Sequence, residues 1–306
     1  MKSQTLTLYA ILQPQVATLR GFLLCFCMKI SVISPPLSKD PVSWVHRYES
    51  LVLTKELRRH NHDVEHRVFS GTEQLGSLDS LRFLRLSDEL MLRVTSDLSA
   101  LGISYAGPEA GVLNTCYDKL VSTQIVAEAG ISCPATMTAD TYRGGWKPVL
   151  LKPRRGCDSL GVRVYRSGRI PEAFSTQNFL VQPFLPSMEI TVGVLGKHIG
   201  CPLWIVRPLD KVYSFRRKHF VPTPRVELSD PDTARAARRI ARTVAEIFGI
   251  RYSARVDLLF DPNSGAFFFL ECDAFPAVPS TSSFAESLER SGMGRKDQLR
   301  RLLEPH

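Results

Sequence analysis

The segment RVDLLFDPNSGAFFFLECDAFP, residues 255–276, reads as two apolar strands joined by a turn. It nevertheless carries three carboxylates, those of Asp257, Glu271 and Asp273, where a sheet is usually apolar. Crowded carboxylates repel one another, and burial strengthens the repulsion. A divalent cation would remove this repulsion, and oxygen-only ligands favour Mg²⁺ or Mn²⁺ over zinc. Neutralisation by Arg255 and by nearby lysines is the alternative explanation of the cluster.

The turn of this hairpin sets the predicted register. We expect a five-residue loop at 261–265, which places Phe260 opposite Ala266. Arg255 then faces Glu271, and because side chains alternate along a strand, the two aspartates share its face. The other face is predicted to be buried in a core through Phe268, Leu270 and Cys272.

A magnesium site of this kind predicts a phosphate-binding segment, because Mg²⁺ commonly keeps waters and phosphates among its ligands. The sequence has no GxxxxGK[ST] pattern and no GxGxxG that opens a helix, which excludes the common P-loop and Rossmann patterns. Lys152 ends a short apolar strand, and RRGCDSLG, residues 154–161, follows as a loop that contains Gly156 and Gly161. Such a loop between two strands can cover phosphates with its backbone N–H groups. An ordinary hairpin turn is the alternative.

The pattern along the chain predicts three structural parts. From Met28 onward, strand-like and helix-like segments alternate, which is typical of an α/β unit with a small parallel sheet. We expect this domain at 28–108, a central lobe with the loop at 109–183, and a C-terminal lobe at 184–306. Residues 1–27 are interpreted as an extension upstream of the natural start, with a signal peptide as the alternative.

Two neighbouring segments of the C-terminal part differ in pattern. Residues 209–231 show no clean period and are interpreted as a long mobile loop. Residues 232–250, DTARAARRIARTVAEIFGI, are predicted to form an amphipathic helix that Asp232 caps.

Composition limits the choice of partners and compartment. Lys and Arg number 39 against 30 Asp and Glu, and the formal charge of +9 favours anionic partners. The arginines are dispersed, whereas a nucleic-acid-binding protein would interleave aromatics with a basic stripe, so we expect no nucleic acid. The apolar stretch 19–27 is too short to span a bilayer, so we expect no membrane. Seven scattered cysteines without a CxxC pair indicate free thiols in a reducing cytoplasm.

A few residues of the first α/β unit admit more than one interpretation. Trp44 can lie over a substrate or belong to the core. The histidines have no second ligand cluster, so we interpret them as solvated residues rather than metal ligands; they are His46, His60, His62 and His66.

Six segments between Gly107 and Phe284 resemble, in order and spacing, the ATP-grasp superfamily and its D-alanine–D-alanine ligase-like branch. They are AGPEAGVLNTCYDKLVSTQIVAEAGISCP, VLLKPRRGCDSLGV, LVQPFLPSMEITVGVLG, YSFRRKHF, ARVDLLF and LECDAFPAVPSTSSF. The resemblance implies an α/β fold of three subdomains, in which a small parallel-sheet domain precedes two α+β lobes that hold the nucleotide. It also implies a carboxylate–amine ligase: ATP phosphorylates a carboxylate, and an amine attacks the acyl phosphate.

The resemblance further implies roles for individual residues. Those implied to bind ATP are Lys119, Lys152, Ser159, Gln182, Phe184, Leu185, Glu189 and Lys218. Those implied to act on the reacting groups are Arg255, Lys218 and Ser282. Those implied to hold two Mg²⁺ ions, or Mn²⁺, are Asp257, Glu271 and Asp273.

Several residues depart from the family pattern. Asp158 replaces a substrate-contacting Ser, His219 replaces an aromatic residue, Asp273 replaces Asn, and Gln182 replaces Glu. The glycine-rich Glu segment and the HGxxGEDG-like stretch that bind the first D-alanine have no counterpart before Tyr105. We therefore expect small amino-acid-like substrates in an altered pocket, joined into a dipeptide or a modified amino acid. A true D-alanine–D-alanine ligase and a non-catalytic ATP-binding protein are the alternatives, and a homodimer is left open.

Overall fold

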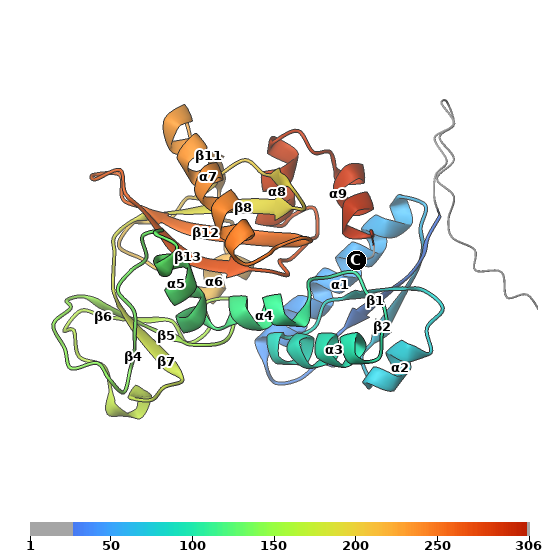
Figure 1. Cartoon of the computed structure of the whole chain (residues 1–306), viewed down its shortest axis with the longest axis horizontal. Coiled ribbons are helices and arrows are strands. Elements are labelled where there is room, and N and C mark those ends of the chain that lie inside the picture. Colours follow the sequence, from blue (N-terminus) through green and yellow to red (C-terminus); the bar gives the residue numbers. More distant parts are fainter. Residues whose placement is uncertain (1–26, 305–306) are drawn as a thin grey trace, which may run out of the picture.

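The computed structural model describes residues 27–304 (Figure 1). Residues 1–27 are the interpreted upstream extension, and all of them but Cys27 lie outside the described residues. The strands form three sheets, and helices pack beside them. The largest of these sheets, called the larger sheet below, lies between the other two in Figure 1.

The first part of the chain forms a small parallel sheet in the order β2-β1-β3. Its strands are β1 (Lys29–Ser34), β2 (Asp63–Val68) and β3 (Leu81–Leu84). Its helices are α1 (Pro41–Arg59), α2 (Thr72–Gly76) and α3 (Asp88–Ala100). The central strand β1 is buried after Lys29, as expected for a parallel strand with both faces covered. The parallel α/β unit predicted from the alternating pattern is therefore confirmed.

The middle part forms an antiparallel sheet in the order β4-β7-β5-β6. Its strands are β4 (Met137–Thr138), β5 (Val149–Pro153), β6 (Arg163–Tyr165) and β7 (Phe179–Pro183). Two helices, α4 (Ala110–Tyr117) and α5 (Lys119–Glu128), precede it, and the 3₁₀ turn η1 (Glu172–Phe174) precedes β7. Asp118 caps α5 by accepting from the backbone N–H groups of Leu120 and Val121, so that Lys119 begins the helix.

The C-terminal part forms the larger antiparallel sheet, in the order β11-β10-β8-β12-β13 with β9 paired to β8. Its strands are β8 (Met188–Leu195), β9 (His198–Ile199), β10 (Leu203–Ile205), β11 (Arg225–Glu227), β12 (Ser253–Phe260) and β13 (Phe267–Asp273). Its helices are α6 (Phe215–His219), α7 (Pro231–Ile247), α8 (Ser283–Arg290) and α9 (Arg295–Leu302). Residues 209–231 therefore contain a short helix and an edge strand, and their interpretation as a long loop is wrong in part.

The register predicted for the hairpin of β12 and β13 is wrong. Phe260 faces Phe267 rather than Ala266, and Arg255 faces Asp273 rather than Glu271. The register shifts between Asp257 and Leu258 because β13 inserts one extra residue, which is a β-bulge. Because of the bulge, Glu271 and Asp273 still lie on the same face of the sheet as Arg255 and Asp257. The predicted cluster of carboxylates is therefore present, although the residues pair differently across the strands.

The bulge also changes which side chains of β13 are buried. Cys272 is buried as predicted, but Phe269 is the buried phenylalanine instead of Phe268. Leu270 is half-buried and lines a cavity instead of the core.

A second correction concerns the N-cap of α7, which is Asp230 and not the predicted Asp232. The carboxylate of Asp230 accepts a hydrogen bond from the backbone N–H of Thr233 at 2.8 Å.

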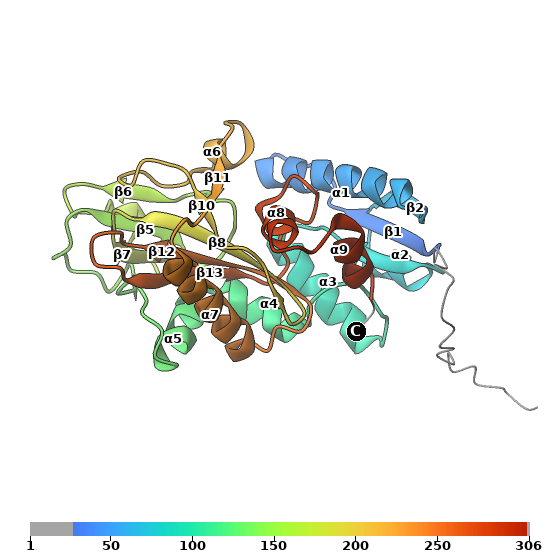
Figure 2. The same cartoon turned by 90° about the horizontal axis from the view of Figure 1, so that it is seen from above.

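Side-chain contacts join the first domain to the C-terminal part, and they fix the loop after β13. Glu56 on α1 accepts a hydrogen bond at 2.9 Å from the backbone N–H of Ser280, and it pairs with Arg295 on α9. In Figure 2, α8 lies at the right-hand end of the larger sheet, and α9 lies next to α8, below α1. Among residues 27–304, no helix combines the length and the apolar character needed to cross a membrane.

Candidate active site

Two adjoining cavities lie where the three parts meet, with volumes of about 580 Å³ and about 100 Å³. Every site residue predicted from the sequence lines at least one of them. The larger cavity is lined by Arg255, Asp257, Asp273 and Ser282. The smaller cavity is lined by Lys152, Ser159, Gln182, Phe184 and Leu185. Both are lined by Lys119, Glu189, Lys218 and Glu271.

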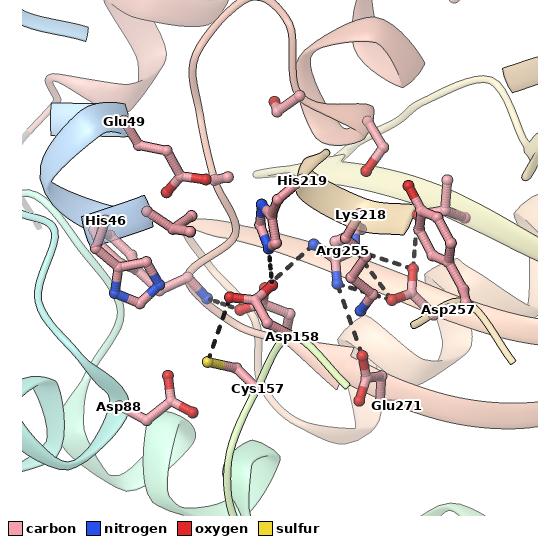
Figure 3. Close-up of a pocket in the computed structure, with 18 of the residues that line it drawn as sticks. His46, Glu49, Asp88, Cys157, Asp158, Lys218, His219, Arg255, Asp257 and Glu271 are labelled. Carbon is pink, nitrogen blue, oxygen red and sulfur yellow. Dashed lines mark hydrogen bonds and ion pairs between the residues drawn. The ribbon is translucent and has the colours of Figure 1, made fainter. Parts of the chain in front are cut away.

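Arg255 contacts all three carboxylates of the acidic cluster, and Figure 3 shows it beside Asp257 and Glu271. Its guanidinium lies 2.9 Å from Asp257, 3.4 Å from Asp273 and 3.8 Å from Glu271. Asp257 also accepts a hydrogen bond at 2.7 Å from the hydroxyl of Thr191 on β8. The positive charges of Lys119, Lys152 and Lys218 also act on Glu271, and that of Arg85 acts on Asp273. The neutralisation by Arg255 and nearby lysines that the sequence left open as an alternative is therefore present.

The carboxylates of the cluster differ in their electrostatics. Burial by itself would raise the pKa of Glu271, but the positive charges of Lys218, Lys119 and Arg255 hold it well below its usual range. Burial raises the pKa of Asp273, although Arg255 opposes the shift. Burial is the main cause of the raised pKa of Asp273, so the shift reports its desolvation. The oxygen-only donor set fits a divalent cation.

Three lysines from three different elements line the cavities: Lys119 and Lys218 line both, and Lys152 lines the smaller one. Lys119 donates to the backbone carbonyl of Gly156 in the loop between β5 and β6. Lys152 on β5 is 4% exposed, and burial together with the positive charge of Lys119 lowers its pKa to about 8. Burial would lower the pKa of Lys218 too, but Glu271 raises it above its usual value. Ammonium groups gathered beside carboxylates suit a polyanion bridged by a metal ion.

The smaller cavity combines apolar walls with a few engaged polar groups. Its apolar walls include Leu150, Val162, Leu259 and Leu270. The amide of Gln182 donates to the Thr136 hydroxyl at 2.7 Å, and the N–H of Phe184 donates to the Pro148 carbonyl at 3.0 Å. Glu189 is paired with Arg207 at 3.1 Å, and burial raises its pKa. A slot of this kind fits a planar heterocycle whose polar edge meets a few fixed groups.

The first domain contributes residues that the sequence interpretation missed (Figure 3). His46 is 2% exposed and lines the larger cavity, so its interpretation as a solvated residue is wrong. Arg85 and Asp88 follow β3 and also line this cavity, and Arg85 pairs with Glu49 at 2.7 Å. The signal available was positional, because ligands bind beyond the carboxyl ends of strands in parallel sheets. Trp44 lines the same cavity from α1, so of its two interpretations the substrate-facing one fits.

The loop at 154–161 and helix α6 meet through an ion pair. His219 Nε2 lies 3.2 Å from Asp158 Oδ1. Burial by itself would raise the pKa of Asp158, but the hydrogen bond with His219 and the positive charges of Lys218 and His219 hold it well below its usual range. Asp158 and Ser159 adopt positive φ values of 56° and 58°, which non-glycine residues rarely do. Two of the residues predicted to depart from the family pattern, Asp158 and His219, therefore contact each other directly.

Comparison with known proteins defines the class. The sequence model of the ATP-grasp domain matches residues 116–269, which is half of the chain. The chain belongs to the ATP-grasp family. The family and the fold class predicted from the sequence are confirmed, as is its assignment to the ATP-dependent ligases of the D-alanine–D-alanine ligase-like branch. ATP-grasp ligases use ATP and divalent metal ions, and the donor sets described above fit both.

Individual relatives make the likeness more specific. The chain is 23% identical over 234 residues to the D-alanine–D-alanine ligase of Carboxydothermus hydrogenoformans, covering 67% of this chain and 74% of the relative. It is 27% identical over 215 residues to that of Thermotoga petrophila, covering 64% and 69%.

Two solved structures show the same fold. The D-alanine–D-alanine ligase of Bacillus anthracis has a TM-score of 0.74 at 18% identity, covering 90% of this chain and 96% of that one. The VanG D-Ala:D-Ser ligase of Enterococcus faecalis has a TM-score of 0.69 at 16% identity, covering 91% and 99%.

Proposed function

We propose that this ligase joins a carboxylate to an amine through an acyl phosphate, and that its amino-acid pocket differs from that of D-alanine–D-alanine ligases. The product we propose is a dipeptide or a modified amino acid, with ADP and phosphate released. One observation carries the proposal: three lysines, Arg255 and three carboxylates from separate segments all line two adjoining cavities.

The donor sets support a division of the site. We assign the smaller cavity to the adenine, with Gln182 and the backbone at 184–185 at its edge and Glu189 toward the ribose. The phosphates are assigned to the lysines and to the 154–161 loop; the lysines are Lys119, Lys152 and Lys218. The ligands of two Mg²⁺ ions are assigned as Asp257, Glu271 and Asp273. The metal ions supply charge neutralisation for phosphoryl transfer when bound.

Arg255 and Ser282 face the larger cavity, where the substrates would react. Arg255 is held by its carboxylate contacts, so its guanidinium is fixed before the reaction begins. It would stabilise negative charge that develops on the carbonyl oxygen, and losing one such donor lowers the rate by about 10²–10³-fold. The Ser282 oxygen accepts from the N–H of Ala285 at 3.1 Å, which leaves its O–H proton able to donate to a substrate carboxylate.

The altered pocket rests on residues that replace the family pattern. Asp158 and His219 form an ion pair at positions where the family places a Ser and an aromatic residue. His46, Arg85 and Asp88 add a histidine and two charged groups from the first domain. Such a wall differs in charge and hydrogen-bonding capacity from the predicted family pattern, which supports a different acid or amine.

A panel of single and paired amino acids, with D-alanine included, tests this function. Release of ADP and phosphate is measured with Mg²⁺-ATP, and Glu271→Gln serves as the inactive control. We expect amino-acid-dependent ADP release by the native protein and none by the variant. Equal or faster turnover with D-alanine alone would contradict the altered pocket. Release of AMP and pyrophosphate would contradict the acyl phosphate.

A further inference from the structure

We propose that one substrate is an amino acid with a bulky apolar side chain, which packs between Trp44, Tyr48 and Phe220 at the mouth of the larger cavity. The inference rests on the ligase function proposed above and names the substrate class.

Three exposed aromatic side chains gather at this mouth. Within residues 27–304, the exposed large aromatics are Trp44 at 58%, Tyr48 at 69% and Phe220 at 71%, and all three line the larger cavity. Trp44 and Tyr48 lie four residues apart on α1, so they share one helix face. Phe220 follows α6, which lies beside the start of α1 in Figure 2. The aromatics therefore approach the mouth from two separate parts of the chain.

Two of the three rings, those of Trp44 and Phe220, have contacts with neighbouring residues, while all three side chains remain exposed. The indole N–H of Trp44 donates to the carbonyl of Ser38 at 3.0 Å. The ring of Phe220 lies 6.0 Å from that of Phe215 and 6.5 Å from that of His219. Uncovered apolar groups rimmed by polar residues commonly mark a binding site. Because these rings border the cavity that holds Arg255, a substrate bound there is the occupant that best accounts for them.

The inner part of the same cavity suits the amine of such a substrate. Asp88 lines it, and its Oδ2 is buried without a hydrogen-bond partner in the described part of the chain. An unpaired buried carboxylate oxygen favours a ligand that brings an ammonium group. The cavity thus offers the Asp88 carboxylate inside and aromatic rings at its mouth, which matches an amino acid whose side chain points outward.

The cavity also has room for a bulky substrate. Its volume of about 580 Å³ lies within the range of pockets that enclose whole small molecules. A methyl side chain, as in alanine, would leave the three rings uncovered. Each methylene that an apolar pocket recognises is worth roughly 10- to 200-fold in discrimination. We expect at least about a tenfold preference in kcat/KM for the best bulky amino acid over alanine.

The test compares bulky and small amino acids in both enantiomeric forms, with phenylalanine, tryptophan and leucine against alanine and serine. Trp44→Ala and Phe220→Ala are measured beside Leu101→Ala, which removes a 64% exposed apolar side chain that does not line the cavity. We expect both rim variants to raise KM for the bulky substrate about tenfold, with KM for ATP unchanged. Leu101→Ala should behave like the native protein.

Calorimetric titration of each amino acid into the protein with Mg²⁺-ADP separates this inference from the ligase function. Tighter binding of a bulky amino acid than of alanine, weakened by Trp44→Ala, supports it. Turnover with alanine or serine but with no bulky amino acid would overturn the inference and leave the ligase function standing. Absence of ADP release with every amino acid would overturn both. A change of oligomeric state in Trp44→Ala, with unchanged amino-acid affinity, would assign the rings to an interface between copies instead.

Discussion

Replacing Lys152 by methionine should stabilise the nucleotide-free protein at neutral pH. The residue is 4% exposed, and burial, together with the charge of Lys119, lowers its pKa from 10.5 to about 8. The pKa of Lys152 is lower in the folded state than in the unfolded chain, so burying its protonated amine lowers the free energy of unfolding at every pH below about 8. This loss of stability becomes smaller as the pH rises from about 8 to 10.5. A shift of this size corresponds to about 3 kcal/mol.

Urea unfolding at pH 7 and at pH 10 measures this effect. At pH 7 without nucleotide, Lys152→Met should exceed the native protein in free energy of unfolding by up to about 3 kcal/mol, and the gap should narrow toward pH 10. Lys197→Met removes an exposed lysine from the turn between β8 and β9 and should change little. Adding Mg²⁺-ATP should reverse the order, since a ligand stabilises only the protein that binds it. A variant that is less stable at pH 7, or a gap independent of pH, would refute the reasoning.

Three further substitutions test other parts of the site. Arg207→Ala leaves the carboxylate of Glu189 buried and unpaired, so urea unfolding should show a loss of about 3–5 kcal/mol; an unchanged midpoint would contradict the buried pair. Arg255→Lys should lower kcat by about 10²–10³-fold in the ADP-release assay while calorimetry shows ATP affinity retained; an equal loss of ATP affinity would instead indicate a role in nucleotide binding. Asp158→Asn removes the ion pair with His219, so hydrogen exchange at 154–161 should accelerate, and unchanged exchange would show that the pair does not hold the loop.

The acidic cluster was predictable from the sequence, but its strand pairing was not. Because side chains alternate along a strand, Asp257 lies on the same face as Arg255 in any register with the partner strand. The partner residue depends on a turn and a bulge, and the bulge shifts the register between Asp257 and Leu258. A bulge leaves no clear mark in a run such as FFFL, because every residue there suits either face.

The wall contributed by the first domain lay beyond sequence reasoning for a different reason. His46 and Asp88 reach the cavity because the parallel sheet packs against the C-terminal part, and contacts such as that of Glu56 with Ser280 fix this arrangement. Local pattern carries no information about such packing. The helix cap shows the same limit on a smaller scale: Asp230 and Asp232 flank Pro231, and the pattern alone favoured the wrong aspartate.

The central claim is that the carboxylates around Arg255 hold a divalent cation which in turn holds the phosphates of ATP. Calorimetric titration of ATP, with and without Mg²⁺, tests it most directly on the native protein and on Glu271→Gln. We predict that native binding strengthens at least tenfold when Mg²⁺ is added, and that the variant loses this response. Equal ATP binding with and without Mg²⁺, or an unaltered response in Glu271→Gln, would contradict the claim.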